Sequence, residues 1–302
     1  MHNSPAMNVS SQKIAVMKFS ALGDIAATLP LLREMDPAPC IITSPIGKAF
    51  YEDEFPDFIV LPNKNPLNIF RLVKRIRDRH FTDLIDLQGN DRCRFICRTA
   101  TLISQTKQHN GFDTNRTPPY SLFVKELHAA ATARLIYQPK PRGYIVLNTG
   151  SSAKWSAKRL PAWKWEEFAT QLNARFGLPF KLTGSREEID YIRSISDQIP
   201  FDTEVLAGKT SLPELKHILK GAFLTVSTDS AAMHISAVEK TPTIGLFGST
   251  SPISLPAQKW VTALYDKTYY PDGQLPQCTD IIDNYYDNIR IEDGLAQLEP
   301  YL

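Results

Sequence analysis

The sequence has few cysteines, no long apolar run and almost no net charge. Its four cysteines, Cys40, Cys93, Cys97 and Cys278, are scattered, and no second Cys or His pair completes a zinc site. We therefore expect reduced thiols and no bound metal. Positions 1–13 lack the apolar core of a signal peptide, and no later segment approaches the roughly 20 apolar residues that cross a bilayer. We expect a cytoplasmic protein that is able to touch a membrane surface.

Two common nucleotide-binding signatures are also missing. No G-x-G-x-x-G follows the first predicted strand, and no segment has P-loop spacing, which argues against a dinucleotide dehydrogenase and a P-loop NTPase. We find no recognisable element for reading nucleic acid either, so we expect no nucleic-acid partner. The net charge is only +2, so any attraction to anions must come from local clusters of cations.

The 302 residues, 43% of them hydrophobic, suit one large or two medium domains with real cores. Short β-branched or Leu-rich runs alternate with longer amphipathic stretches, which predicts α/β architecture with parallel sheets covered by helices on both faces. The predicted strands are 14–19, 40–43, 58–61, 83–87, 144–148, 180–183, 203–206, 223–227 and 242–247. The Pro- and Gly-containing segment 138–143 reads as a linker, so we predict domains at 1–140 and 141–302.

An acidic residue follows one predicted strand in each half of the chain. Asp24 comes after the strand 14–19 and Asp229 comes after the strand 223–227, each at the start of a predicted helix. The helix predicted after Asp24 covers residues 25–34. Ligands of open parallel sheets bind beyond the carboxyl ends of the strands, where loops enter helices. The pattern therefore predicts two facing lobes with a site between them.

Each acid has a structural and a functional interpretation. Asp24 is either an N-terminal cap that accepts backbone N–H groups, or a general base that takes a proton from an attacking hydroxyl. Asp229 is either a cap, a role that Ser230 could share, or an acceptor of hydrogen bonds from sugar hydroxyls. One turn later, His234 is either a packed histidine or a donor to a phosphate or hydroxyl.

Two further segments are rich in cations. The loop 149–161 begins with Thr149, Gly150 and Ser151, contains Lys158, and is either a solvated basic loop or a loop that closes on phosphates. The predicted helix 69–80 carries its cations largely away from its apolar face, which indicates a solvated surface or a contact with acidic lipid head groups or a phosphorylated acceptor. The candidate acceptor-binding cations in this half are Arg75, Arg92, Arg94 and Arg116.

Taken together, these segments resemble glycosyltransferase family 9, the bacterial heptosyltransferases of the lipopolysaccharide inner core. The matching segments, in chain order, are Lys18 to Ile25, Asp83 to Gly89, Leu127 to Ala129, Lys158 to Pro161, Asp229 to His234 and Leu246 to Thr250. Any one of these matches is weak, whereas the ordered set is specific.

The resemblance implies a GT-B fold, in which two Rossmann-like domains with parallel sheets face each other across a cleft, often with a C-terminal segment that returns to the first domain. It implies inverting transfer of heptose from ADP-heptose to a lipid A–Kdo acceptor, without a metal or cofactor, on the cytoplasmic face of the inner membrane. The nucleotide sugar and the anionic glycolipid are then the expected partners.

By matching position, the resemblance makes Asp24 the general base and Lys158 the contact to the donor diphosphate. Asp229 would bind heptose hydroxyls, and Glu187 and Thr210 would meet the ribose and adenine. The residues that would present backbone N–H groups to phosphate are Ser230, Ala231 and Ala232.

Some positions depart from the family pattern. Ser230 and Ala231 stand where threonine and glycine are usual, and Ser251 replaces an acid that often precedes the proline. These departures keep two alternatives open. One is a family member that uses another nucleotide sugar for a different glycan or protein acceptor, and the other is a catalytically silent protein that binds a nucleotide sugar.

Overall fold

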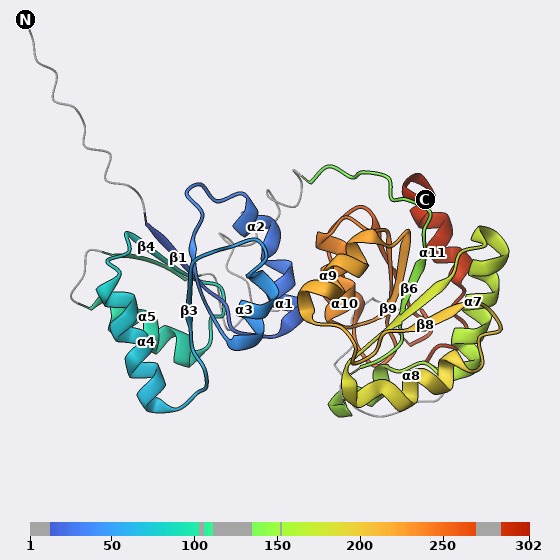
Figure 1. The fold of residues 1–302 in the computed structure, drawn as a ribbon, viewed down its shortest axis with the longest axis horizontal. Helices are drawn as coiled ribbons and strands as arrows, with labels where there is room; N and C mark the ends of the chain where they lie inside the picture. The colour runs from blue at the N-terminus through green and yellow to red at the C-terminus, as the bar shows by residue number, and fades with distance from the viewer. Residues whose placement is uncertain (1–12, 103–105, 111–134, 152, 270–284) are drawn as a thin grey trace, which may run out of the picture. The chain divides into compact units, whose positions relative to one another are not determined.

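The chain forms two compact units, Met1–Ala131 and Thr132–Leu302, in a computed structural model that describes residues 13–102, 106–110, 135–151, 153–269 and 285–302 (Figure 1). The division falls earlier than the expected boundary at 140/141. The physical reason is that Leu135 and Tyr137 pack against Trp260 of the second unit. Lys140 also donates to the backbone oxygens of Lys220 and Glu239.

The first unit contains one parallel sheet with the strand order β3-β2-β1-β4-β5. Its strands are β1 Ile14–Met17, β2 Cys40–Thr43, β3 Phe58–Val60, β4 Asp83–Asp86 and β5 Lys107–Asn110. Its helices are α1 Leu22–Ala27, α2 Leu29–Arg33, α3 Pro45–Tyr51, α4 Pro66–Asp78 and α5 Asp91–Thr101. α4 and α5 cover one face of the sheet, and α1, α2 and α3 lie on the other (Figure 1).

Local sequence explains the helix boundaries of this unit. α4 begins earlier than the predicted 69–80, because the Asn65 side chain accepts the Leu67 N–H and caps the helix at Pro66. The helix predicted over 25–34 is instead two short helices, α1 and α2. Pro30 has no N–H to continue the first helix and occupies the first turn of the second.

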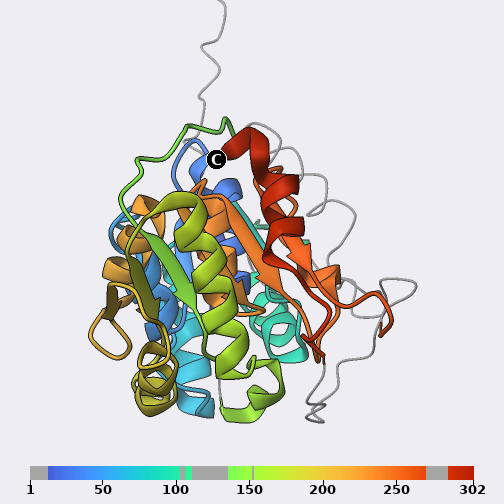
Figure 2. The same cartoon turned by 90° about the vertical axis from the view of Figure 1, so that its right-hand side faces the viewer.

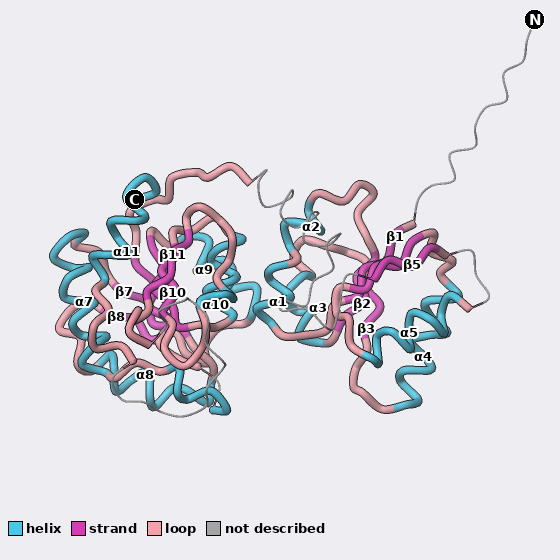
Figure 3. Tube along the Cα trace, turned by 180° about the vertical axis from the view of Figure 1, so that it is seen from behind, coloured by secondary structure: helices cyan, strands magenta, loops and turns pink. Residues whose placement is uncertain are grey.

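The second unit contains a six-stranded parallel sheet with the order β11-β10-β9-β6-β7-β8. Its strands are β6 Ile145–Asn148, β7 Phe180–Thr183, β8 Thr203–Val205, β9 Leu224–Thr228, β10 Thr243–Leu246 and β11 Val261–Leu264. Its α-helices are α7 Ala162–Phe176, α8 Ile189–Ser196, α9 Leu212–Gly221, α10 Ala231–Val238 and α11 Ile291–Leu298. α11 lies beside β11 and α7 (Figure 2), while α9 and α10 cover the opposite face (Figure 3).

The strand order of both sheets reverses at one point. In the first unit the chain moves outward from β1 through β2 to β3 and then returns to β4 on the other side of β1; in the second, β9 lies beside β6 in the same way. The loops that leave the two neighbouring strands then run to opposite faces of the sheet, and ligands of such sheets bind in the space this opens. Each unit is therefore Rossmann-like, as predicted, and the two switch points, β1/β4 and β6/β9, locate the candidate sites.

The cysteines within the described residues are reduced and buried. Cys40, Cys93 and Cys97 form no disulfide, and burial raises the pKa of Cys40 and of Cys93 to about 12. Cys278 lies outside the described residues. Within the part of the chain that the structure describes, no three His, Cys, Asp or Glu side chains are grouped as metal ligands, and no helix has the length and apolar character needed to span a bilayer.

Candidate functional site

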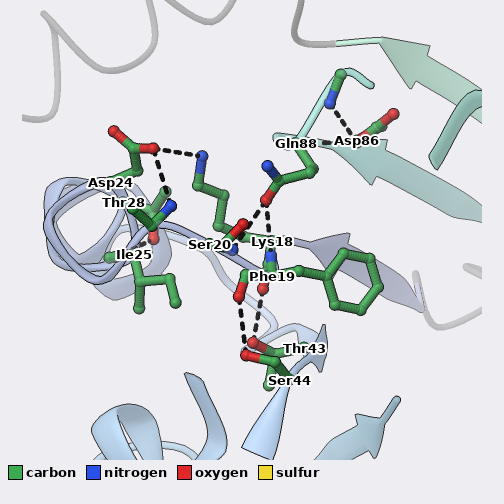
Figure 4. Close-up of polar contacts among 12 residues, drawn as sticks. Lys18, Phe19, Ser20, Asp24, Ile25, Thr28, Thr43, Ser44, Asp86 and Gln88 are labelled. Carbon is green, nitrogen blue, oxygen red and sulfur yellow. Dashed lines mark hydrogen bonds and ion pairs between the residues drawn. The ribbon is translucent and has the colours of Figure 1, made fainter. Parts of the chain in front are cut away.

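The turn that follows β1 carries Asp24, and the end of β4 holds its backbone. The Gln88 Oε1 atom accepts hydrogen bonds from two consecutive backbone N–H groups, those of Phe19 at 2.9 Å and Ser20 at 3.0 Å (Figure 4). Because Gln88 follows β4, its side-chain amide links the end of β4 to the turn after β1 at the switch point. The sequence motif that contains Gln88 was recognised, but its structural role was not predicted.

The end of β2 holds the same turn from the opposite side. Thr43 Oγ1 donates to the Lys18 carbonyl at 2.6 Å, and Ser44 Oγ donates to the Phe19 carbonyl at 2.8 Å (Figure 4). Gly47 makes this possible, because a Cβ atom at that position would collide with Thr43 Oγ1. The conformation of the turn is thus fixed by strands on both sides of β1.

Asp24 lies in the first turn of α1, where one of its two carboxylate oxygens makes a capping contact. Its Oδ2 accepts the Ala21 N–H at 3.0 Å, which is a capping contact, and lies 3.6 Å from Lys18 Nζ. Among the described residues Oδ1 has no hydrogen-bond donor, and the side chain is 49% exposed. A capping contact through one oxygen leaves the other available to a substrate hydroxyl, so the assignment as general base remains a prediction.

Two ionisable groups that the sequence did not single out lie behind Asp24. Lys18 is 3% exposed and Asp86 is 1% exposed. Burial lowers the pKa of Lys18, partly opposed by the carboxylates of Asp24 and Asp86. Burial also raises the pKa of Asp86. Hydrogen bonds from the Gly89 and Gln88 N–H groups to Oδ1 oppose this shift, but Oδ2 is buried and has no hydrogen-bond partner among the described residues.

We predict that Asp86→Asn removes a contribution to the free energy of unfolding that is largest at low pH and falls as the pH rises. Asp86 binds its proton more tightly in the folded chain, so its contribution is fully present below the unfolded pKa, near 3.8, and is lost as pH rises through the raised folded pKa. Urea unfolding at intervals from pH 4 to pH 7 measures the effect, with exposed Asp78→Asn as control. A slope unchanged by Asp86→Asn, or equally changed by Asp78→Asn, would contradict it.

In the second unit, Lys158 and Asp229 form an ion pair at the switch point of β6 and β9. Lys158 Nζ donates to Asp229 Oδ2 at 2.8 Å and to its backbone carbonyl at 3.1 Å. Their side chains are 16% and 11% exposed, and Ser254 Oγ donates to the other carboxylate oxygen at 3.3 Å. Two residues that are 71 positions apart in the sequence are therefore brought together where the topology predicts a ligand site.

The capping interpretation of Asp229 and Ser230 is wrong. α10 begins at Ala231 with Ser230 as its N-cap residue, and the Ser230 side chain makes no capping hydrogen bond. Ser230 Oγ instead accepts a hydrogen bond from Asn148 Nδ2 at 2.9 Å, while Asp229 is held by Lys158. Neither of these two side chains therefore caps the first backbone N–H groups of α10.

Among the described residues, three buried hydroxyl groups at the same edge of the second sheet have no hydrogen-bond partner. They belong to Thr149, after β6, and to Ser249 and Thr250, after β10, and each residue is at most 2% exposed. Buried polar groups are rarely left unsatisfied, so an unpartnered set is a marker of a functional site or of bound water. Thr149 was predicted as a contact to the nucleotide-sugar donor. Ser249 and Thr250 belong to a matching sequence segment, but no role was predicted for either residue.

A buried acid, Glu188, lies against the loop after β6, next to Glu187, for which the ribose contact stays a prediction. Glu188 is 7% exposed, accepts the Ser185 N–H at 2.6 Å and contacts Gly150 so closely that a Cβ atom there would collide with its carboxylate. Glu187 is exposed, and hydrogen bonds from its own backbone N–H and from the Ser185 hydroxyl lower its pKa. The sequence contains two adjacent acids, and no pattern in it indicates which of the two is buried.

We predict that Gly150→Ala damages this site. The added methyl group displaces Glu188, so we expect the free energy of unfolding to fall by about 1–3 kcal/mol, together with weaker nucleotide binding. Gly143→Ala is the matched control, because a Cβ atom at that position meets nothing within 4 Å. Denaturant unfolding and calorimetric titration with ADP measure both effects. Equal behaviour of the two variants would contradict the assignment.

The other predicted donor-site residues are spread around the same edge of the sheet. Ser151 is buried and donates to the Trp155 carbonyl at 2.7 Å, and Ala232 is 4% exposed in the first turn of α10. Ala231, His234 and Thr210 are partly exposed, the first two on α10 and Thr210 just before α9.

A tyrosine near the C-terminus supports the Lys158 loop and was missed by sequence reasoning. Tyr286 Oη donates to the Lys158 carbonyl at 3.0 Å, and its ring lies against Gly248, where a Cβ atom would collide with it. The Trp155 ring lies 5.2 Å from Lys158 Nζ. Lys158 is therefore contacted by Trp155 in its own loop, by Asp229 after β9 and by Tyr286 near the C-terminus.

The candidate acceptor-binding arginines are only partly brought together. Arg92 and Arg94 lie on the first turn of α5, beside the switch point, and the Arg94 charge acts on Asp86. Arg75 lies on α4 and donates to the Val60 carbonyl at 3.4 Å, at the end of β3. Arg116 falls outside the described residues, as does the predicted motif at Leu127 to Ala129.

Comparison with known proteins places these features in a family. The family model described as glycosyltransferase family 9 (heptosyltransferase) matches residues 92–269, which is more than half of the chain. The chain is 48% identical over 187 residues to lipopolysaccharide heptosyltransferase 3 of Escherichia coli, an alignment that covers 58% of this chain and 49% of that protein. It is 25% identical over 157 residues to the lipopolysaccharide core heptosyltransferase OpsX of Haemophilus influenzae, covering 48% and 45%. The chain thus spans about half the length of these relatives, or less.

Solved structures share the fold over nearly the whole chain. A family 9 glycosyl transferase from Veillonella parvula has a TM-score of 0.70 at 18% identity, covering 98% of this chain and all of that one. ADP-heptose lps heptosyltransferase II of E. coli has a TM-score of 0.66 at 18% identity, covering 96% and 99%. E. coli heptosyltransferase WaaC with ADP-2-deoxy-2-fluoro heptose also scores 0.66, at 17% identity, covering 95% and 99%. The two Rossmann-like units are those of a GT-B fold.

Proposed function

The chain belongs to glycosyltransferase family 9, and from this premise we propose that it is an inverting glycosyltransferase that moves heptose from ADP-heptose to a lipopolysaccharide inner-core acceptor. The observation that carries the proposal is the Lys158–Asp229 pair at the β6/β9 switch point, with unpartnered hydroxyls at the same edge of the sheet. The proposal also includes action on the cytoplasmic side of the inner membrane, where both substrates would be reached.

The chemistry of the second unit suits a sugar diphosphate. A lysine ammonium group has three N–H donors, and Lys158 uses two of them on Asp229. The third is available to a phosphate oxygen, and the uncapped N–H groups of α10 offer a second anchor. Asp229 faces the ligand as a carboxylate that accepts hydrogen bonds from sugar hydroxyls.

The relatives support the choice of donor. One solved relative is a heptosyltransferase with ADP-2-deoxy-2-fluoro heptose, and another contains ADP. Both structures are similar to this chain in fold, and lipopolysaccharide heptosyltransferase 3 is similar in sequence over about half of its length. ADP-heptose is therefore the donor we propose first.

The first unit supplies the base for a single displacement. The acceptor hydroxyl oxygen attacks the anomeric carbon as the bond between that carbon and the departing ADP oxygen breaks, and Asp24 takes the hydroxyl proton. Attack from the face opposite the leaving group inverts the anomeric configuration. Lys158 and the N–H groups of α10 stabilise the charge that develops on ADP, so the proposed reaction requires no metal or cofactor. The reaction further requires that the two switch points be brought together around the substrates.

We predict that Asp24→Asn removes transfer while leaving donor binding intact. General base catalysis contributes about 10²–10⁴ in rate, and Asp24 lies in a different unit from Lys158. ADP release from ADP-heptose, with truncated lipopolysaccharide as acceptor and EDTA present, measures turnover, and calorimetry measures ADP affinity. Asp78→Asn, on the exposed face of α4, is the control. Full turnover by Asp24→Asn would refute its role as base.

We predict that Lys158→Met weakens ADP binding and lowers kcat by about 10²–10³, because the leaving diphosphate loses its closest cation. Lys48→Met is the matched control, since the Lys48 side chain is 49% exposed in the first unit and forms an ion pair with Glu52 on the same helix. An ADP affinity unchanged by Lys158→Met would show that the phosphate site lies elsewhere.

A second candidate keeps the fold and changes the donor. Ala231 begins α10 where the family usually has glycine, and its methyl group narrows the approach to the helix. Calorimetric titration of the wild-type protein with ADP, UDP and GDP separates the candidates. Tighter binding of UDP or GDP would exclude ADP-heptose, whereas tight ADP binding without turnover would favour a silent binding protein.

A further inference from the structure

Exposed apolar side chains gather on α4 and α5 of the first unit. Among the described residues, seven large hydrophobic side chains are exposed, and four of them lie on these two helices or at the end of α5. They are Leu67 (65% exposed), Phe70 (58%), Phe95 (47%) and Leu102 (78%). Single exposed apolar residues are common, but a group of them on neighbouring elements marks an interaction surface.

The four side chains form one patch because of helical spacing. Leu67 and Phe70 are three residues apart on α4. Phe95 on α5 and its C-cap residue Leu102, which keeps helical backbone angles, are seven residues apart, so each pair lies on one helix face. The rings of Phe70 and Phe95 contact edge to face with centroids 6.4 Å apart, which joins the two faces. The helices lie side by side in Figures 1 and 3. We call these four residues the apolar patch.

The patch is surrounded by positive charge. α4 and α5 together carry seven cations and two carboxylates, a net charge of +5, whereas the whole chain carries +2. Arg71 and Lys74 continue the stripe of Leu67 and Phe70, and Arg98 lies on the face of Phe95; all three are exposed. The excess charge of the protein is therefore concentrated around its exposed aromatic side chains.

We propose that the apolar patch and its cations dock the first unit on an anionic lipid surface. Aromatic and leucine side chains enter the boundary between head groups and acyl chains, while lysine and arginine stay at the level of the lipid phosphates. Anionic lipids add attraction for each cation near the surface. A second copy of the chain is disfavoured as the occupant, because two surfaces of net charge +5 repel each other.

This docking surface goes beyond the transfer reaction, yet it lies on the unit that holds Asp24. α5 begins at Asp91, shortly after Gln88, whose amide holds the turn before Asp24. A lipid-anchored acceptor would thus be met by the same unit that supplies the proposed base. Binding to lipid requires no donor and no turnover, so the test below is independent of the proposed function.

The experiment measures flotation of the whole chain with two kinds of vesicle. One contains phosphatidylcholine alone, and in the other about one lipid in three is phosphatidylglycerol, which gives a strong negative surface potential. We expect binding to the anionic vesicles only, falling steeply between about 0.1 and 1 M salt as the Debye length shrinks. The double variant Lys74→Gln/Arg98→Gln should lose about fivefold in the partition coefficient for each cation removed. Phe70→Ser/Phe95→Ser should lose tenfold or more.

Two control variants lie in the second unit. Trp163→Ser removes an aromatic side chain of similar exposure (48%), and Arg193→Glu reverses an exposed charge on α8; both should bind vesicles as the wild type does. ADP titration of every variant reports an intact second unit, and far-UV circular dichroism reports folding. Absence of wild-type binding, or equal loss in patch and control variants, overturns the proposal. Dimerisation that Phe70→Ser/Phe95→Ser abolishes would identify a second copy as the occupant and overturn it as well.

Discussion

The reversal of strand order at one point in each sheet is the constraint on which both candidate sites depend. Where the loops after β1 and β4 leave for opposite faces, backbone N–H groups lose the neighbours that a continued sheet would supply. In the first unit the Gln88 side chain replaces them. In the second, Thr228 Oγ1 donates to the Gly150 carbonyl at 2.6 Å, and the Ser230 side chain leaves the start of α10 uncapped. The strand order alone therefore predicts which edge of each sheet presents polar groups that could meet a ligand.

Both switch points also contain a cation beside a carboxylate, at different depths. Lys18 is almost fully buried while its partner Asp24 is half exposed, so burial lowers the pKa of the cation and the acid stays in contact with solvent. Lys158 and Asp229 are both largely covered and directly hydrogen-bonded. The first arrangement leaves a carboxylate accessible to solvent, and the second holds an ammonium group and a carboxylate in a fixed orientation. The difference matches the base and phosphate roles proposed for the two units.

Much of the architecture was predictable because the chemistry of these elements is local. All nine predicted strands are present, since runs such as Ile14–Met17 and Leu224–Thr228 are short, β-branched and buried on both faces. Two strands were missed. β5 was missed because its sequence, Lys-Gln-His-Asn, has no apolar pattern and forms a strand through pairing with β4. β11 was also missed, although its sequence, Val-Thr-Ala-Leu, is largely apolar. The single helix predicted over 25–34 failed at Pro30, a signal that was available in the sequence.

The site was less predictable because its contacts join distant residues. Asp24, Lys158 and Asp229 were found from motifs, but the pairing of Lys158 with Asp229 overturned the capping interpretation of Asp229. The burial of Lys18, and the choice of Glu188 over Glu187 as the acid beside Gly150, depend on packing that no spacing rule encodes.

The hydrogen bond from Tyr286 to the Lys158 carbonyl has a practical consequence for anyone who shortens or tags this chain. The last 17 residues, which include α11, pack as part of the second unit's core and hold the backbone of the loop that carries Lys158. A deletion made to trim an apparently peripheral tail would therefore expose core residues and release the Lys158 loop at the same time.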